Sequence, residues 1–365
     1  MTLPIHIRSL RRFQLRLRFP QRRRSAWPAQ RGSALLAVLW LSAALAAIAF
    51  SVSSTVRTET ERVSTSSDGL RASYLATGAV ERAIQWMVWG APYRKPDGSP
   101  MFWEKNQPRL SMSFPSGAAV VDVIPETSKL NINQASADDL YRVVFAVVGD
   151  ETRAKEIADG IQDWRGGASA SGSFDQYYFS IRPTFQARHA SFQEIEELLL
   201  VRGMTPEFFY GNYTADSDGR LFARGGLRDC LSTWGSTGPF DVNTASPALL
   251  EAVGVAPGDV VTLLGKRPFK NIGDVLQVTP YVARLTVGGG RTIYTLRATA
   301  RLRRADGMFS DVVRTASATV KLLDPRQPAY PAVVLRWYDD AWSQGIVPPF
   351  DTLNFENGNA GGPHP

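Results

Sequence analysis

A stretch of 24 residues without a single charge, residues 33–56, constrains this chain more than any other feature. It is built mainly from Ala, Leu, Val, Ile, Phe and Trp, and it contains neither Pro nor Gly. An α-helix rises about 1.5 Å per residue, so roughly 20 residues cross the hydrocarbon layer of a membrane. Because a helix pairs its backbone N–H and C=O groups internally, the stretch predicts a membrane-spanning helix. The alternative is a buried core helix, which would usually show a polar face over such a length.

The residues before this stretch indicate its orientation. Residues 1–32 hold nine arginines and no acidic residue, and positive charge flanking a membrane helix stays in the cytoplasm. We therefore expect a single-pass protein of the inner membrane, with a cytoplasmic N-terminus and the bulk of the chain in the periplasm. Without residues 1–32 the count of Lys and Arg falls from 41 to 32 against 34 acidic residues, a net charge of −2. The basic character thus belongs to the leader and does not indicate affinity for nucleic acid.

The helical pattern continues beyond the apolar stretch. Apolar residues recur at intervals of three, four and seven, as one helix face requires. This face consists of Val63, Leu70, Tyr74, Thr77, Val80, Ile84 and Val88. Gly90-Ala91-Pro92 then ends the pattern. We expect one helix over residues 33–90 that needs a surface to pack on, with two separate helices as the alternative.

Two regions of alternating apolar and polar residues predict β-structure. The first is a hairpin, with a turn at residues 115–117, and the second contains Asp306-Gly307 between two long alternating runs, a strong hairpin signal. The predicted strands are residues 109–114, 118–124, 291–301, 308–322 and a short edge strand at 332–337. Residues 343–365 are rich in Pro, Gly and Asn, which predicts a disordered tail.

Residues 127–285, between the two β regions, are predicted to be helical and contain an internal repeat. Residues 130–136 (LNINQAS) and 240–246 (FDVNTAS) each place an Asn at the end of an extended stretch and a Ser at a helix N-cap. Pro247 then occupies a first helical position, which suits proline. We interpret the repeat as a structural device that starts a helix.

The same repeat resembles the opening of helix-hairpin-helix modules, which often bind DNA phosphates. Residues 127–285 hold 15 Lys and Arg but 19 Asp and Glu, a net charge of −4, and the first turn carries Asp150 and Glu151 where phosphate would lie. Phosphate binding depends on positive charge, so we expect no nucleic-acid partner. A membrane-tethered periplasmic DNA-binding receptor remains the alternative function.

The start of the apolar stretch resembles the processing site of type IV pilins and pseudopilins. Residues 30–36 (QRGSALL) carry this resemblance, which implies that a prepilin peptidase cleaves between Gly32 and Ser33 and that Ser33 is N-methylated. Most members have Glu at the fifth mature position, where this chain has Ala37. Lack of this Glu is typical of the minor pseudopilin K of type II secretion systems. Residues 159–164 (DGIQDW), Tyr177-Tyr178 and residues 192–204 also resemble that family, although the loop after Trp164 lacks its usual acids.

The resemblance implies an α+β fold, in which a long N-terminal transmembrane and amphipathic helix packs on a small antiparallel sheet. A large inserted α-helical domain would contain helix-hairpin-helix or SAM-like repeats. The expected division is a leader (1–32), the long helix (33–90), the first β part (91–126), the helical insert (127–285), the second β part (286–342) and the tail (343–365). The implied function is that of a structural subunit at the tip of the pseudopilus, with the I- and J-type minor pseudopilins as partners.

The residues offer little for catalysis, so we expect no enzyme activity. His6 lies in the leader and His364 in the tail, Cys230 has no second cysteine to pair with, and no G-x-S-x-G motif occurs. A generic membrane-anchored enzyme therefore rests on nothing positive. Asp216 and Asp218, followed by Gly219, predict a weak calcium loop, because hard cations want several oxygens from one tight turn. A solvated polar loop is the alternative, and the resemblance implies calcium binding without naming ligands.

Overall fold

The computed structural model describes residues 33–90, 93–104, 107–166, 173–215, 218–219, 221–288, 292–323, 331–339 and 350. The chain divides into two compact units after Arg62, and each is described by itself. Helix α1 (Ser33–Gly90) is a single element of 58 residues, which confirms the prediction of one continuous helix. Residues 34–62 of α1 are exposed, and within the described ranges α1 is long and apolar enough to cross a membrane.

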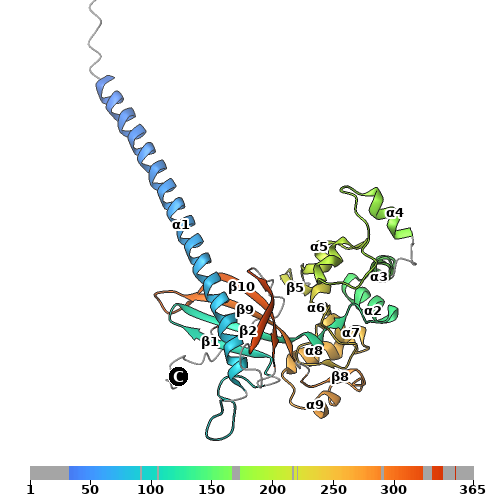
Figure 1. Cartoon of the computed structure of the whole chain (residues 1–365). Helices are drawn as coiled ribbons and strands as arrows, with labels where there is room; N and C mark the ends of the chain where they lie inside the picture. The colour runs from blue at the N-terminus through green and yellow to red at the C-terminus, as the bar shows by residue number, and fades with distance from the viewer. Residues whose placement is uncertain are drawn as a thin grey trace, which may run out of the picture. The chain divides into compact units, whose positions relative to one another are not determined.

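The second unit contains an antiparallel five-stranded sheet (Figure 1). Its order is β1-β2-β9-β10-β11, so the two predicted β regions meet where β2 pairs with β9. The five predicted strands are confirmed, and β11 lies at the edge as expected. Their bounds are β1 Arg109–Phe114, β2 Gly117–Pro125, β9 Ile293–Arg303, β10 Phe309–Leu322 and β11 Ala332–Tyr338.

The part of α1 in the second unit packs on one face of this sheet, but through other residues than the sequence predicted. Val63, Leu70 and Tyr74 are exposed, whereas the fully buried positions of this helix face are mostly alanines. Contacts at the sheet edge support the placement, because the Arg82 guanidinium lies 5.4 Å from the ring centroid of Phe114 on β1. The buried residues of α1 are Ala72, Leu75, Ala76, Ala79, Val80, Ala83, Trp86 and Met87. The predicted face was therefore wrong at its N-terminal end, whereas Val80 is buried and Thr77, Ile84 and Val88 are partly buried.

The other face of the sheet holds Phe350, which is 2 % exposed. Its ring packs against Ala118 and Val120 of β2 and against Phe309, and the Arg301 guanidinium lies 5.3 Å from the ring centroid. Ala118 and Val120 alternate with the β2 residues that face α1, so Phe350 lies on the side away from the helix. The rest of the predicted disordered tail lies outside the described residues.

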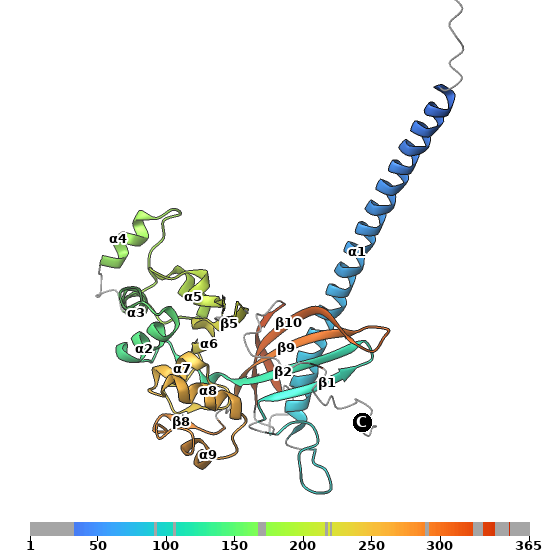
Figure 2. The same cartoon turned by 180° about the vertical axis from the view of Figure 1, so that it is seen from behind.

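We call the described residues between β2 and β9 the helical insert (Figures 1 and 2). It has its own hydrophobic core, which shares no residue with the core between α1 and the sheet. Its helices are η1 Glu126–Ser128, α2 Ala137–Val148, α3 Glu151–Arg165, α4 Ser173–Ser180, η3 Ile195–Leu200, α5 Pro206–Tyr210, α6 Leu227–Cys230, α7 Pro247–Ala252, α8 Pro257–Lys266 and α9 Ile272–Leu276. Its short strands pair as β3 Leu130–Asn131 with β6 Leu231–Ser232, β4 Gly211–Ala215 with β5 Leu221–Gly225, and β7 Phe240–Asp241 with β8 Leu285–Thr286.

The sequence repeat corresponds to a repeated structural unit. The Asn133 side chain exchanges two hydrogen bonds with the backbone of Phe192 (2.8 and 2.9 Å), and Asn243 does the same with Phe269 (2.7 and 2.9 Å). Each asparagine side chain thus serves as the hydrogen-bond partner of backbone groups in a distant loop segment, where a strand or helix would otherwise supply one. In each copy an arginine donates to the carbonyl before the N-cap serine, Arg165 to Ala135 and Arg267 to Ala245, and Ser136 and Ser246 cap α2 and α7.

Candidate functional site

The residues predicted for processing and calcium binding are largely outside the described part of the chain. Gly32 and Asp216 are not described, and Ser33 is the first residue of α1. Asp218 is described in a turn next to Gly219. The cleavage site and the calcium loop therefore stay predictions, and the polar contacts that the structure brings together lie elsewhere, where the helical insert meets the sheet.

The sheet contributes two rows of polar side chains to this junction. Thr295 of β9, Thr319 of β10 and Arg336 of β11 are directly opposite one another in register. Arg297, Ser317 and Tyr338 form the next row, two residues along each strand. Directly opposite residues in antiparallel strands lie on the same face, and so do residues two apart on one strand. The rows therefore form one continuous polar surface of hydroxyls and guanidinium groups.

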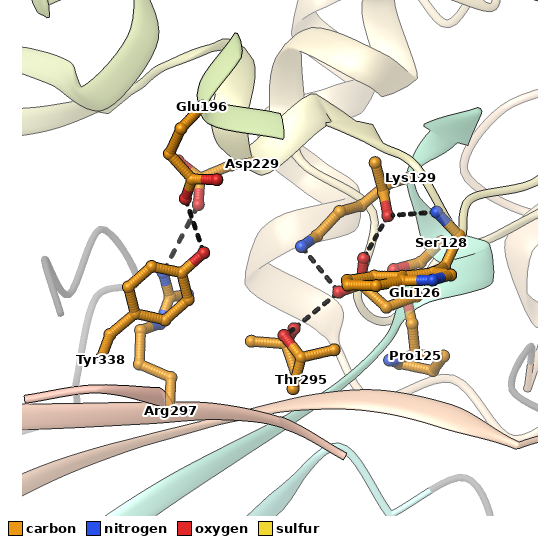
Figure 3. A network of polar contacts seen from close by, with 12 residues as sticks. Pro125, Glu126, Ser128, Lys129, Glu196, Asp229, Thr295, Arg297 and Tyr338 are labelled. Atoms are coloured by element: carbon orange, nitrogen blue, oxygen red, sulfur yellow. Dashed lines mark hydrogen bonds and ion pairs between the residues drawn. The ribbon is translucent and has the colours of Figure 1, made fainter. Parts of the chain in front are cut away.

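Glu126 lies at the root of the insert and contacts the first row (Figure 3). It is 3 % exposed, and its carboxylate accepts hydrogen bonds from Lys129 Nζ (2.8 Å), Thr295 Oγ1 (2.6 Å) and Ser232. Burial alone would raise the pKa of Glu126, but the Lys129 ammonium and the three hydrogen bonds outweigh it and lower the pKa. The buried group is thus a charged carboxylate that ties η1, β6 and β9 together.

Two further groups of contacts join the polar rows of the sheet to the insert (Figure 3). Arg297 pairs with Asp229 of α6 at 3.5 Å, with both side chains at most 20 % exposed. On β11, Arg336 pairs with Glu194 and Glu196, and the Tyr338 hydroxyl donates to Glu196 Oε1 at 2.6 Å. Burial, together with this hydrogen bond to a carboxylate, raises the pKa of Tyr338, so the phenol stays protonated.

The negative charges at this junction come from the insert, whereas the positive charges come from Lys129 of the insert and from Arg297 and Arg336 of the sheet. The insert supplies the carboxylates Glu126, Glu194, Glu196 and Asp229, and the sheet supplies hydroxyls and guanidiniums. Such an arrangement holds the helical insert on the sheet. The sequence singled out residues 192–204 only by their resemblance to the K-type family. The partners of Glu196 on β11 lie about 140 residues further on, and no local pattern predicts them.

A second polar cluster lies at the end of α3. His189 Nε2 is 3.0 Å from a carboxylate oxygen of Asp175, and His189 Nδ1 is 3.2 Å from the backbone oxygen of Asp163. Because both neighbours are acceptors, both ring nitrogens must donate, which requires the imidazolium. Burial alone would lower the pKa of His189, but the hydrogen bond to Asp175 and the nearby Asp163 outweigh it and raise the pKa.

The spacing of this cluster also allows metal binding, since ligand atoms of Asp163, Asp175 and His189 lie within 4.8 Å of one another. Calcium prefers six to eight oxygen ligands, and a set of two carboxylates and an imidazole does not fit that preference. His189 bonds the Asp175 carboxylate and the backbone oxygen of Asp163, whereas the buried Asp163 Oδ2 has no hydrogen-bond partner among the described residues. The cluster therefore does not supply the calcium site that the sequence predicted.

Replacing His189 by glutamine is expected to destabilise the full chain, in detergent, by about 1.5–3 kcal/mol at pH 6, because hydrogen bonds to charged groups contribute about that much. A raised pKa in the folded state gives stability that is complete below the unfolded value near 6.5 and is lost as the pH rises through the folded pKa. The deficit in urea unfolding should therefore shrink toward pH 9. Asp175→Asn should reproduce this pH dependence, and a deficit that is equal at both pH values would contradict it.

Comparison with known proteins places part of the chain in a family. Residues 125–210 match the family model described as type II secretion system (T2SS), protein K. No curated protein gives a significant match. One similar solved structure is described as the GspK-GspI-GspJ complex from the enterotoxigenic Escherichia coli type 2 secretion system, with 15 % identity, a TM-score of 0.45, and coverage of 77 % of this chain and 100 % of that chain.

The matched residues run from the end of β2 through α5 and include Glu126, Asn133 and His189. They begin at the point where the chain leaves the sheet, so they form the first part of the helical insert. Residues 125–210 of this chain are therefore a domain that matches the type II secretion system protein K family.

Proposed function

We propose that this chain is a K-type minor pseudopilin of a type II secretion system and that it occupies the tip of the pseudopilus. The observation that carries the proposal is the protein K domain inserted between β2 and β9 of a sheet that packs on a long helix. In pilin-like subunits the glutamate at the fifth mature position would neutralise the N-terminal amine of the earlier neighbour. A subunit at the tip has no earlier neighbour, which agrees with Ala37 at this position. The insert would block addition of a further subunit. The role is structural, and no enzyme activity is needed for it.

We further propose that α1 anchors the chain in the inner membrane before assembly, with residues 1–32 in the cytoplasm and the sheet and insert in the periplasm. The arginine-rich leader supports this orientation. The I- and J-type minor pseudopilins are the proposed partners, as the family resemblance implies. Calcium at Asp216 and Asp218 stays a proposal as well. The DNA-receptor alternative gains no support from the family match.

Co-expression with a prepilin peptidase tests the class and the orientation together. We expect the intact mass to show loss of residues 1–32 and the gain of one methyl group on Ser33. Gly32→Ile should abolish this processing, because the peptidase requires an unhindered backbone at the cleavage site, while Gly98→Ala, far from the site, should leave it unchanged. An unprocessed wild-type chain would leave only an ordinary single-pass anchor.

Co-purification then tests the partners. The processed chain should associate with the I- and J-type pseudopilins encoded beside it. Failure to associate, despite correct processing, would contradict the tip assignment without affecting the pilin-like class.

A further inference from the structure

We propose that Arg336 and Tyr338 on the edge strand β11 form a releasable latch for the helical insert, while Glu126 at its root is a fixed attachment. The two attachments lie on the same polar rows of the sheet but differ in burial and in their connection to the chain. This inference rests on contacts within one chain and does not depend on the proposed position at the tip.

Little apolar packing between described residues holds the insert on the sheet. The buried core of the insert and the core between α1 and the sheet are separate clusters. Among the described residues, the two are bridged by the hydrogen bonds and ion pairs of Figure 3 and by the pairs of Arg336 with Glu194 and Glu196. Interfaces between bodies of one chain that are largely polar allow relative motion by default. The strength of the separate polar contacts therefore decides which side of the insert can leave the sheet.

The side chains of the root attachment are more deeply buried than those of the latch. At the root, the Glu126 and Lys129 side chains are 4 % and 13 % exposed. At the latch, the side chains of Glu194, Glu196 and Arg336 are 49 %, 29 % and 24 % exposed. Partly exposed ion pairs contribute little and are weakened by salt, whereas breaking a buried pair leaves an uncompensated charge. The carboxylates of the latch can be hydrated after release, and the carboxylate of the root cannot.

The two attachments also differ in the separation along the chain of the segments that they join. Glu126 directly follows Pro125, the last residue of β2, so the root contact is formed where the insert leaves the sheet. The latch joins η3 to β11, segments about 140 residues apart in sequence. Release of the latch thus requires no break of the local contacts around η1. It would free the side chains of Arg336 and Tyr338 on the edge strand β11, where Val333, Val334 and Leu335 are already exposed.

Amide hydrogen exchange of the full chain in detergent tests the latch. Arg336→Met should accelerate exchange in Ile195–Leu200 and Ala332–Tyr338 by about 5- to 30-fold, which corresponds to a loss of about 1–2 kcal/mol. Tyr338→Phe, which removes only the hydroxyl, should act in the same segments more weakly. The matched control is Arg304→Met, which breaks the exposed pair with Asp311 on the same sheet and should not change either segment.

Salt provides a second measurement that needs no variant. Raising the salt concentration from 0.05 to 0.5 M should accelerate exchange in η3 and β11 but not in η1, β6 or the centre of β9, because screening acts on the partly exposed pairs. Equal acceleration across the whole insert would overturn the proposal, and so would unchanged exchange in η3 and β11 after Arg336→Met. Neither result would affect the processing or partner tests.

Discussion

Replacing Glu126 by alanine is expected to lower the free energy of unfolding by about 3–5 kcal/mol, the cost of breaking a buried ion pair. The Lys129 ammonium, 13 % exposed, would lose its carboxylate. The hydroxyls of Ser232 and Thr295 would lose their acceptor at the same time. Since these groups come from the root of the insert, from β6 and from β9, the loss of stability should affect both the insert and the sheet.

Urea unfolding of the full chain in detergent measures this effect. Asp138→Ala, which breaks the exposed pair with Arg142, is the control and should change stability by less than about 0.5 kcal/mol. The double variant Glu126→Ala with Lys129→Met should recover part of the loss, because it removes both buried charges. A loss for Glu126→Ala no larger than the control would show that the carboxylate is not the buried, charged group described above.

The same carboxylate has a pH signature. Its pKa is lowered in the folded state, so its stabilising contribution is present above the unfolded value near 4.5 and is lost as the pH falls through the folded pKa. The difference between wild type and Glu126→Gln should therefore shrink in acid. His189 acts in the opposite sense, since its contribution is lost as the pH rises.

Local sequence patterns predicted the elements of this fold well. Alternation and turn residues marked the strands, and Ser136 and Ser246 marked two helix starts, because each of these signals acts within a few residues. The candidate site could not be found in the same way. Glu126 and Thr295 are 169 residues apart, and Asn133 meets Phe192 across 59. Such contacts depend on how the elements pack, which no local pattern contains.

The face of α1 was misjudged for a different physical reason. Large apolar residues at helical spacing suggested a buried face through Val63, Leu70 and Tyr74, yet these are 68 %, 61 % and 77 % exposed. The sheet instead meets a face rich in alanine, whose small side chains give almost no signal in a hydropathy pattern. The facing strands are rich in alanine as well, with Ala298, Ala300, Ala316 and Ala318 fully buried.

Replacing Ala79 by phenylalanine is therefore expected to destabilise the chain by about 3 kcal/mol, near the upper end of the usual range for overpacking a core. Ala79 is 0 % exposed, and the alanines that surround it in the same cluster cannot give way by changing rotamer. Leu70→Ala on the exposed face, where a larger side chain is removed, should cost less than about 0.5 kcal/mol. Urea unfolding of the two variants decides between the faces. If Leu70→Ala costs more than Ala79→Phe, α1 meets the sheet through the face that the sequence pattern predicted, and the alanine face is not the packed one.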